Sequence, residues 1–312
     1  MEKKIGMRDW NWEITNKCNL RCLHCIVGEC HRCELTTREV LIAISRIVKL
    51  GGKNIKLTGG EPLMRKDINL IIQEAHSLGL NVDLITNGTM LNDDFLKKYA
   101  GRINHIAVSI DGPKKIHDYI RGKESYERAI LALKKTMEFD IDLSAYITIH
   151  ALNENLIDLL IEELILIGVR SFHFNEINIE GRASENRHLI LRPNRIEDRL
   201  ENLISQLSRN IEIDKISLDS SCSISPESVY LKSDGRIYAC VEIAFKAPEQ
   251  KIAHILDPEV GEKISHYFLK EVDGTTHKCC YTSFSMSGIS ILFNEQKKCP
   301  LTRRIDNESS FK

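Results

Sequence analysis

Three cysteines near the start of the chain have a spacing that suits a metal centre. Cys18, Cys22 and Cys25 occur in CNLRCLHC, with three and then two residues between them. Thiolates are the ligands that iron–sulfur clusters and zinc prefer. Structural zinc takes four ligands, usually from two C-x2-C pairs, whereas a [4Fe–4S] cluster held by three cysteines keeps one iron open for another molecule. The spacing therefore favours a cluster, with zinc or free thiols as the alternative.

Two further features lie in or beside this motif. His24 is a possible fourth ligand, but its neighbour Cys25 is already a ligand, so we expect the His24 side chain to face away from the cluster. Cys30 and Cys33 form a C-x2-C pair directly after the motif. They are expected to be incidental or structural thiols; a zinc site, a second cluster or a hydrogen-atom donor are the alternatives.

The remaining cysteines lie far away in the sequence, and the composition decides how to interpret them. No cysteine occurs between Cys33 and Cys222, so two separate sites are expected. The chain of 312 residues is 42% hydrophobic and 28% charged, with a net charge of −1. With so little net charge, the composition gives no reason to expect a basic patch that would bind nucleic acid or an anionic membrane. No signal peptide or apolar run of membrane-spanning length is present, so we expect a cytoplasmic protein whose cysteines bind metal rather than form disulfides.

The middle of the chain repeats one strand-to-helix step. Alternating or continuous apolar runs predict strands over residues 10–15, 54–58, 81–86, 103–110, 141–149 and 170–177. Helical patterns follow the first five of them, over 35–52, 67–79, 93–100, 125–139 and 155–168. Thr36 and Glu39 have the spacing of a capping box at the start of the first helix. Strands joined in this way predict an α/β fold with a parallel sheet, either open or curled toward a partial barrel.

The polar motifs follow the strands at the edge where an α/β protein builds its active site. The cysteine motif follows the first strand, GGEP the second, TNG the third, and SIDGP ends the fourth. After a predicted helix over 195–208 the pattern changes, because Asp234-Gly235 lies between two alternating runs and indicates a β-hairpin. We therefore predict two domains, 1–214 and 215–312.

The motifs CNLRCLHC, LTGGEPL, ITNG and SIDGPKKIHDYIRG, in this order, resemble those of the radical S-adenosylmethionine (SAM) enzymes. The resemblance is to the branch with SPASM or twitch extensions, which includes peptide maturases, sulfatase maturases and aminocyclitol dehydrogenases. It covers residues 10–180 and, more loosely, 215–300. It implies a partial (β/α)6 barrel of parallel strands, followed by a small α+β iron–sulfur domain.

The resemblance also implies roles for individual residues. Cys18, Cys22 and Cys25 would hold a [4Fe–4S] cluster whose open iron binds SAM, and reductive cleavage would give a 5′-deoxyadenosyl radical. Residues expected near SAM are Gly59 and Gly60 at the methionine, Glu61 at its ammonium, Ser109, Asp111 and Arg121 at the ribose and carboxylate, and His24 and 177–183 at the adenine. Asp111 and Ser109 are equally well explained as turn residues. Arg121 is better explained as a solvated or ion-paired loop residue.

The second group of cysteines implies one auxiliary [4Fe–4S] cluster. Cys222, Gly235 and Cys240 fit the extension's pattern, and two of the last three cysteines would complete the ligands: Cys299 and either Cys279 or Cys280. With Cys279 as the fourth ligand, the set is Cys222, Cys240, Cys279 and Cys299. Cys280 is then a spare thiol that could return a hydrogen atom to the substrate, as epimerisation requires. Without such a thiol, the cluster would accept the electron that is released when a substrate radical is oxidised. Glu176 and Glu242 are candidate bases, with ion pairing as the alternative.

The resulting functional hypothesis is a radical SAM enzyme that oxidises, crosslinks or epimerises a peptide. The alternatives are a dehydrogenase or epimerase of a small sugar, aminocyclitol or other metabolite, and an electron carrier that never meets SAM. A low-potential flavodoxin or ferredoxin is the expected reductant. Because nothing before Trp10 could form a winged-helix leader-binding domain, a peptide substrate would call for a separate leader-binding partner.

Overall fold

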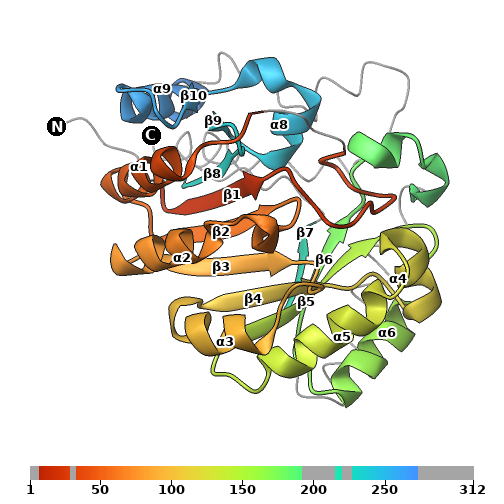
Figure 1. Cartoon of the computed structure of the whole chain (residues 1–312). Helices are drawn as coiled ribbons and strands as arrows, with labels where there is room; N and C mark the ends of the chain where they lie inside the picture. Colours follow the sequence, from red (N-terminus) through yellow and green to blue (C-terminus); the bar gives the residue numbers. More distant parts are fainter. Residues whose placement is uncertain (1–6, 29–32, 192–214, 220–226, 273–312) are drawn as a thin grey trace, which may run out of the picture.

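A ten-stranded sheet organises the computed structural model, which describes residues 7–28, 33–191, 215–219 and 227–272 (Figure 1). The order across the sheet is β10-β9-β8-β1-β2-β3-β4-β5-β6-β7. The strands are β1 (Asp9–Thr15), β2 (Asn54–Gly59), β3 (Asn81–Thr86), β4 (His105–Ser109), β5 (Asp142–Ile149), β6 (Ser171–Glu176), β7 (Lys215–Asp219), β8 (Ser228–Leu231), β9 (Arg236–Tyr238) and β10 (Ala253–His254). No helix in these described ranges is long and apolar enough to cross a membrane.

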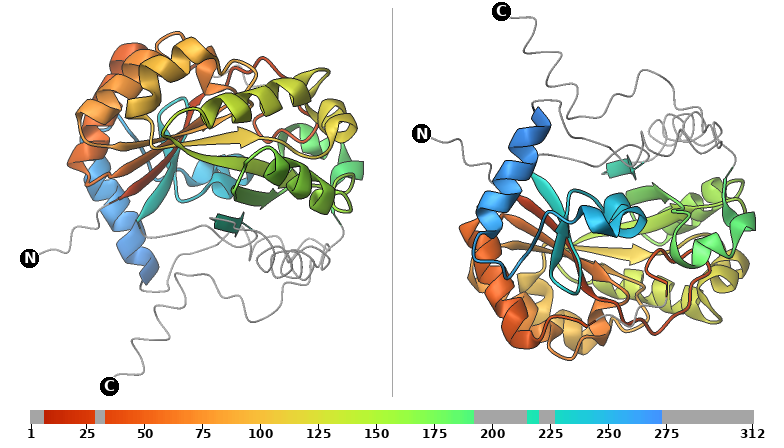
Figure 2. Two further views of the ribbon diagram at one scale, coloured as in Figure 1. Left: turned by 90° about the horizontal axis from the view of Figure 1, so that it is seen from below. Right: turned by 90° about the horizontal axis from the view of Figure 1, so that it is seen from above.

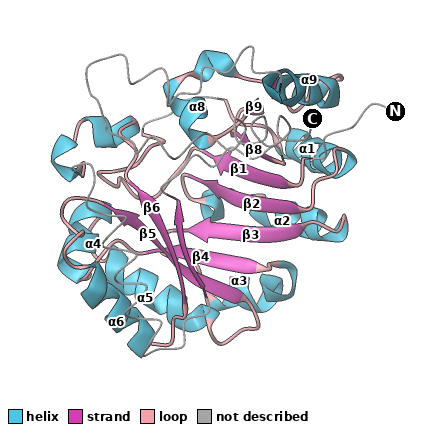
Figure 3. Ribbon diagram, turned by 180° about the vertical axis from the view of Figure 1, so that it is seen from behind, coloured by secondary structure: helices cyan, strands magenta, loops and turns pink. Residues whose placement is uncertain are grey.

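The α-helices mostly connect consecutive strands. They are α1 (Thr37–Lys49), α2 (Ile68–Ser77), α3 (Asp93–Tyr99), α4 (Lys114–Arg121), α5 (Ser125–Thr136), α6 (Ile157–Leu166), α8 (Val241–Lys246) and α9 (Val260–Val272). In Figure 1 the helices that follow β1 to β5 lie in front of the sheet, and the view from behind in Figure 3 exposes the strands. Each of the pairs from β1–β2 to β6–β7 is parallel.

Alternation along the strands explains why the sheet buries one face against these helices. Trp10, Trp12 and Ile14 of β1 are fully buried and belong to the same core as Ile44 and Ile47 of α1. Successive side chains of a strand point to opposite faces, so Asn11 and Glu13, which alternate with these residues, face the other side of the sheet. Helix α1 begins with the predicted capping box, in which the side chains of Thr36 and Glu39 each accept from the other residue's backbone N–H.

The six predicted strands and the five predicted helices are confirmed, with shifts of a few residues at their ends. Helices α4, α8 and α9 were not predicted. Residues 114–121 form α4, and Arg121 is its last residue, so the description of Arg121 as a loop residue was wrong. The buried face of α4 consists of His117, Ile120 and Arg121, and two of these three are polar, so the stretch has little apolar periodicity. The predicted helix over 195–208 lies outside the described residues.

The predicted hairpin is confirmed, and it extends the main sheet. Strands β8 and β9 are antiparallel, and Gly235 between them has φ +86°, a left-handed conformation that favours glycine. Strand β8 pairs in parallel with β1, with Trp10 opposite Val229. At the other edge β7 pairs with β6. The two-domain division at residue 215 stays a prediction. The strands after that position lie on both edges of one sheet (Figure 2).

A buried polar group attaches the hairpin to β1 just before the cysteine motif. Glu13 is 1% exposed and accepts hydrogen bonds from Ser233 Oγ at 3.0 Å and Tyr230 OH at 3.3 Å. Lys232 Nζ lies 3.6 Å from its carboxylate. Burial raises the pKa of Glu13, and the charge of Lys232 opposes this shift. The end of β1 is therefore held by side chains that lie more than 200 residues further along the chain.

Candidate metal centre

The three candidate ligands lie in an irregular segment after β1, residues 16–28, which we call the cysteine loop. Cys22 is buried and Cys18 and Cys25 are half-buried, and all three are free thiols. Burial raises the pKa of Cys18, and it raises that of Cys22 to about 12. Protonated thiols are therefore favoured in the protein alone, and a bound metal would have to displace their protons.

The donor set of the cysteine loop fits a [4Fe–4S] cluster. The three thiols lie near one another, since after burial the charge of Cys25 is among the causes that raise the pKa of Cys18 and of Cys22, and in a cubane each thiolate binds a different iron. Cys18 Sγ also accepts weak hydrogen bonds from Leu20 N at 3.4 Å and Asn87 Nδ2 at 3.9 Å. Hydrogen bonds to the ligand sulfurs are common in iron–sulfur sites and tune their potentials.

The GGEP segment at the end of β2 packs directly on the start of the cysteine loop. Gly60 N donates to Thr15 O and Glu61 N donates to Lys17 O, each at 2.7 Å. A Cβ atom on Gly60 would lie 2.1 Å from Lys17 O, and one on Gly59 would lie 2.2 Å from Thr15 O. These contacts explain why both positions need glycine, independently of any ligand. The predicted approach of SAM to these glycines stays a prediction.

Glu61 has an extended backbone, as is typical of the residue before a proline, with φ −126° and ψ 112°. Its carboxylate is fully buried and accepts hydrogen bonds from Leu63 N, Thr86 Oγ1 and Asn87 N, at 3.1, 2.8 and 2.8 Å. Burial raises the pKa of Glu61 despite these donors. The carboxylate thus connects the ends of β2 and β3, and its predicted contact with the SAM ammonium is untested.

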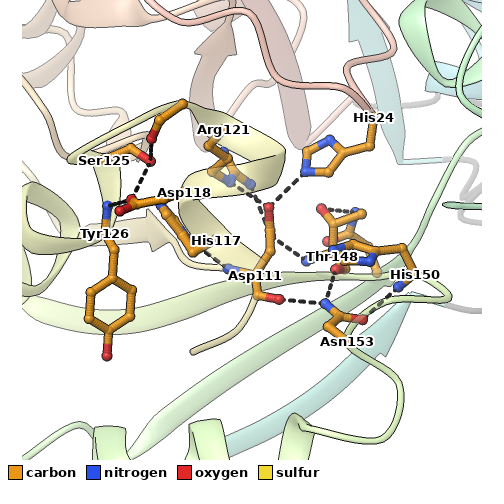
Figure 4. A network of polar contacts seen from close by, with 12 residues as sticks. His24, Asp111, His117, Asp118, Arg121, Ser125, Tyr126, Thr148, His150 and Asn153 are labelled. Carbon is orange, nitrogen blue, oxygen red and sulfur yellow. Dashed lines mark hydrogen bonds and ion pairs between the residues drawn. The ribbon is translucent and has the colours of Figure 1, made fainter. Parts of the chain in front are cut away.

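Asp111 is the centre of a buried network that joins β4, α4 and the cysteine loop (Figure 4). Its carboxylate accepts from Arg121 Nε at 2.5 Å and Nη2 at 3.0 Å, and from Thr148 N at 3.1 Å. His24 Nε2 lies 2.7 Å from the same carboxylate. Although burial acts in the opposite direction on each group, the Arg121 charge holds the pKa of Asp111 well below its usual value, and Asp111 raises that of Arg121.

The network brings together three residues that the family resemblance had named separately. His24, Asp111 and Arg121 are in direct contact, and Ser109 is buried at the end of β4 two residues before Asp111. The Arg121 charge also lowers the pKa of Cys22, although burial is the larger effect. A buried cation therefore lies near the candidate cluster ligands, paired with a carboxylate. The predicted contacts of these side chains with SAM stay predictions.

Three further residues of this network were missed in the sequence. His117 Nδ1 accepts from Asp111 N at 3.1 Å, and Asn153 Nδ2 donates to Asp111 O at 2.6 Å. Asn153 Oδ1 in turn accepts from His150 N at 2.7 Å. Figure 4 shows these side chains around Asp111. No motif marks His150 and Asn153, and the helix that positions His117 was itself not predicted, so the sequence offered no signal for them.

The buried histidines make the folded state sensitive to acid. Burial lowers the pKa of His117 and of His150 to about 4, from 6.5. Between these values the unfolded chain binds a proton that the folded chain does not. The stability that the neutral histidines contribute is therefore fully present above about pH 6.5 and is lost as the pH falls toward 4. Each histidine contributes up to roughly 3 kcal/mol of this loss. Denaturant midpoints measured from pH 7 to pH 4.5 test the slope.

The matched variants are His117→Gln and His76→Gln. Glutamine can still accept from Asp111 N but does not titrate, so His117→Gln should flatten the pH slope of the unfolding free energy. The groups facing His117 include Asp111 and Arg121, whose charges affect its pKa in opposite directions. His76 is exposed, and its replacement should leave the slope unchanged. Equal slopes in both variants would contradict a buried neutral His117.

Other candidate residues lie apart from this network or outside the described residues. Glu176 is exposed at the end of β6, and Cys33 is exposed after the cysteine loop. Cys240 is buried and caps α8, with Ile243 N donating to its sulfur at 3.5 Å. Glu242 contacts Asn178 Nδ2 and Lys246. The candidates outside the described residues are Cys30, Cys222, Cys279, Cys280 and Cys299.

Comparison with known proteins identifies the domain. Residues 12–164 match the model of the Radical SAM superfamily. The chain is 32% identical over 185 residues to the PqqA peptide cyclase of Rhizobium meliloti, covering 57% of this chain and 49% of that protein. It is 27% identical over 297 residues to a probable GTP 3′,8-cyclase of Methanocaldococcus jannaschii, covering 86% and 96%. Several other curated relatives are matched over about half of their length or less.

The fold is also that of a solved peptide-bound protein. SuiB of Streptococcus suis bound to the precursor peptide SuiA has a TM-score of 0.70 at 13% identity, over 88% of this chain and 68% of that one. This likeness shows the α/β radical SAM fold. Proteins of the superfamily bind a [4Fe–4S] cluster and SAM, which agrees with the donor set of the cysteine loop. Residues 12–164 are therefore a radical SAM domain.

Proposed function

We propose that this enzyme cleaves SAM reductively and abstracts a hydrogen atom from a peptide, in a post-translational modification. The observation that carries the proposal is the cysteine loop itself, in which three free thiols follow β1 within the matched domain. When bound there, a [4Fe–4S] cluster supplies the electron that breaks the sulfonium bond of SAM.

The residues of the chain bind and orient these groups. Cys18, Cys22 and Cys25 hold the cluster, and the Asp111–Arg121 pair fixes His24 and with it the middle of the cysteine loop. The proposed SAM contacts are Gly59, Gly60 and Glu61 on the methionine side. On the ribose and adenine side they are Ser109, Asp111, Arg121, His24 and residues 177–183.

A peptide substrate is favoured by the similarity to the PqqA peptide cyclase and by the resemblance of SIDGPKKIHDYIRG to peptide-maturing enzymes. A small-molecule substrate is the second candidate, because the GTP 3′,8-cyclase relative is matched over nearly its whole length. We further propose an auxiliary cluster on Cys222, Cys240, Cys279 and Cys299, with Cys280 and Glu176 as candidate catalytic residues. A flavodoxin or ferredoxin would be the reductant, a separate leader-binding protein a partner, and the cytoplasm the location.

The first test is anaerobic incubation of the iron-loaded chain with dithionite and SAM. Release of 5′-deoxyadenosine supports the proposal, and none from protein with full iron content would support an electron carrier instead. The second test incubates the enzyme with a precursor peptide encoded beside it and deuterated at each residue in turn. Deuterium transfer into 5′-deoxyadenosine identifies a peptide substrate. No transfer from any position, with transfer from a labelled small molecule, would overturn the peptide assignment.

A further inference from the structure

The backbone carbonyls of the cysteine loop are hydrogen-bonded by a short segment that follows β6. Arg182 N donates to Cys25 O, and Arg182 Nε donates to Cys22 O, each at 2.9 Å. Asn186 Nδ2 donates to Leu23 O at 3.2 Å and to Arg182 O at 2.8 Å. Within the loop Cys22 O also accepts from Cys25 N, at 3.3 Å, but an irregular loop lacks the regular carbonyl partners of a helix or sheet. Residues Gly181–Asn186, here called the support segment, supply such partners.

The two backbones fit together at glycines. Gly181 has φ +61°, and a Cβ atom there would lie 2.4 Å from both Cys25 O and Ile26 O. Gly28, with φ +65°, lies opposite, since its Cβ would come within 3.5 Å of Gly181 Cα. Any side chain at Gly181 would push the cysteine loop away. The contact is therefore specific in shape as well as in hydrogen bonding.

A small apolar cluster also contacts the cysteine loop. Leu23 packs against Ile120, Ile177, Ala183 and Leu189, which form a cluster separate from the main core. Leu23 N also donates to the carbonyl of Ile120 at 2.8 Å. Ile120 belongs to α4, whereas Ala183 belongs to the support segment. The cysteine loop thus contacts both of these elements through Leu23.

We propose that the support segment pre-organises the cysteine loop for its cluster, with Arg182 as a positioning residue. The proposal rests on the proposed function, because it takes Cys22 and Cys25 as cluster ligands. Two of the three supported carbonyls belong to those ligand residues, so the hydrogen bonds of Arg182 fix the backbone from which both thiolates project. Outer-shell groups of this kind typically change metal affinity by 10- to 100-fold.

The test compares Arg182→Gln with Arg187→Gln in the full, anaerobically reconstituted chain. Both variants remove one positive charge from the same part of the chain, but Arg187 is exposed and makes none of these contacts. Iron release to an excess of a ferrous chelator is followed by absorbance. We expect Arg182→Gln to release iron about tenfold faster than the wild type, and Arg187→Gln to remain within about twofold. Equal rates in the two variants would overturn the proposal.

Two more variants separate geometry from charge and from folding. Arg182→Lys keeps the charge but lacks the guanidinium Nε, so it should release iron nearly as fast as Arg182→Gln; a wild-type rate would overturn the positioning role. If Arg182→Gln does not fold, Asn186→Leu decides, with a several-fold faster release expected and an unchanged rate contradicting the proposal. Iron release does not depend on SAM cleavage. A wild-type chain that makes no 5′-deoxyadenosine would therefore refute the proposed function and leave this result standing.

Discussion

Replacing Cys18, Cys22 or Cys25 with alanine is expected to abolish 5′-deoxyadenosine formation, by at least about a thousandfold. Each variant removes one of three thiolates from a cluster that has no protein ligand to spare, so the cluster is lost or cannot bind SAM at its open iron. The readouts are iron content after reconstitution and 5′-deoxyadenosine released under dithionite. Both should fall together in all three variants.

Cys33 provides the matched control. It is an exposed free cysteine that follows the cysteine loop at a distance of only eight residues from Cys25. Its replacement by alanine removes a thiol from the same region but none of the three proposed ligands of the SAM-binding cluster, so SAM cleavage should remain near the wild-type value. A Cys25→Ala variant that retains wild-type cleavage would refute the assignment of the ligands.

Breaking the Asp111–Arg121 pair from one side is expected to cost about 3–5 kcal/mol of folding free energy. Asp111→Asn leaves the buried guanidinium of Arg121 without its counter-charge, and Arg121→Met leaves a buried carboxylate with fewer donors. The double variant removes both charges, so it should lose less than the sum of the two single changes. Chemical denaturation of the cluster-free chain under reducing conditions measures all three.

An exposed ion pair beside the same helices serves as the control. Lys114 of α4 and Glu127 of α5 are paired with side chains that are 54% and 63% exposed. Exposed pairs contribute at most about 1 kcal/mol, so Glu127→Gln should have a small effect. If Asp111→Asn costs no more than Glu127→Gln, the network in Figure 4 does not hold the cysteine loop in the way its geometry indicates.

The strands and most helices could be predicted because their apolar patterns are local. Each strand of the parallel core has a run such as NVDLIT or SAYITI, and each predicted helix has an apolar stripe on one face. Helix α4 was missed because its buried face uses His117 and Arg121, whose burial depends on Asp111. A helix whose inner face is satisfied by a distant carboxylate has no periodic apolar signal.

The part of the candidate site that consists of sequence motifs could be predicted. The spacing of the three cysteines and the position of GGEP after the next strand placed these segments together, and the contacts of Gly60 and Glu61 with the loop backbone show this proximity. The pairing of His24 with Asp111 joins residues 87 positions apart. Arg182 lies still farther from the cysteines. Contacts of this kind depend on tertiary packing, which no local pattern encodes.

The attachment of the hairpin to β1 could not be predicted for the same reason. Asp234-Gly235 specifies a turn between two strands, but nothing in those strands indicates which edge of a sheet they join. The structure places β8 beside β1, where Lys232 and Ser233 contact Glu13. The charge pair between Glu13 and Lys232, which lie far apart in the sequence, can be recognised only when the two strands are known to be adjacent.

The most direct test of the central claim is electron paramagnetic resonance of the reduced protein with SAM labelled with ¹⁷O in its methionine carboxylate. A [4Fe–4S] cluster held by Cys18, Cys22 and Cys25 has one iron free to bind that carboxylate. The labelled SAM should therefore give a ¹⁷O hyperfine coupling that unlabelled SAM lacks, and the signal should be absent in Cys22→Ala. A cluster signal that SAM leaves unchanged, or zinc in place of iron in this loop, would contradict the claim.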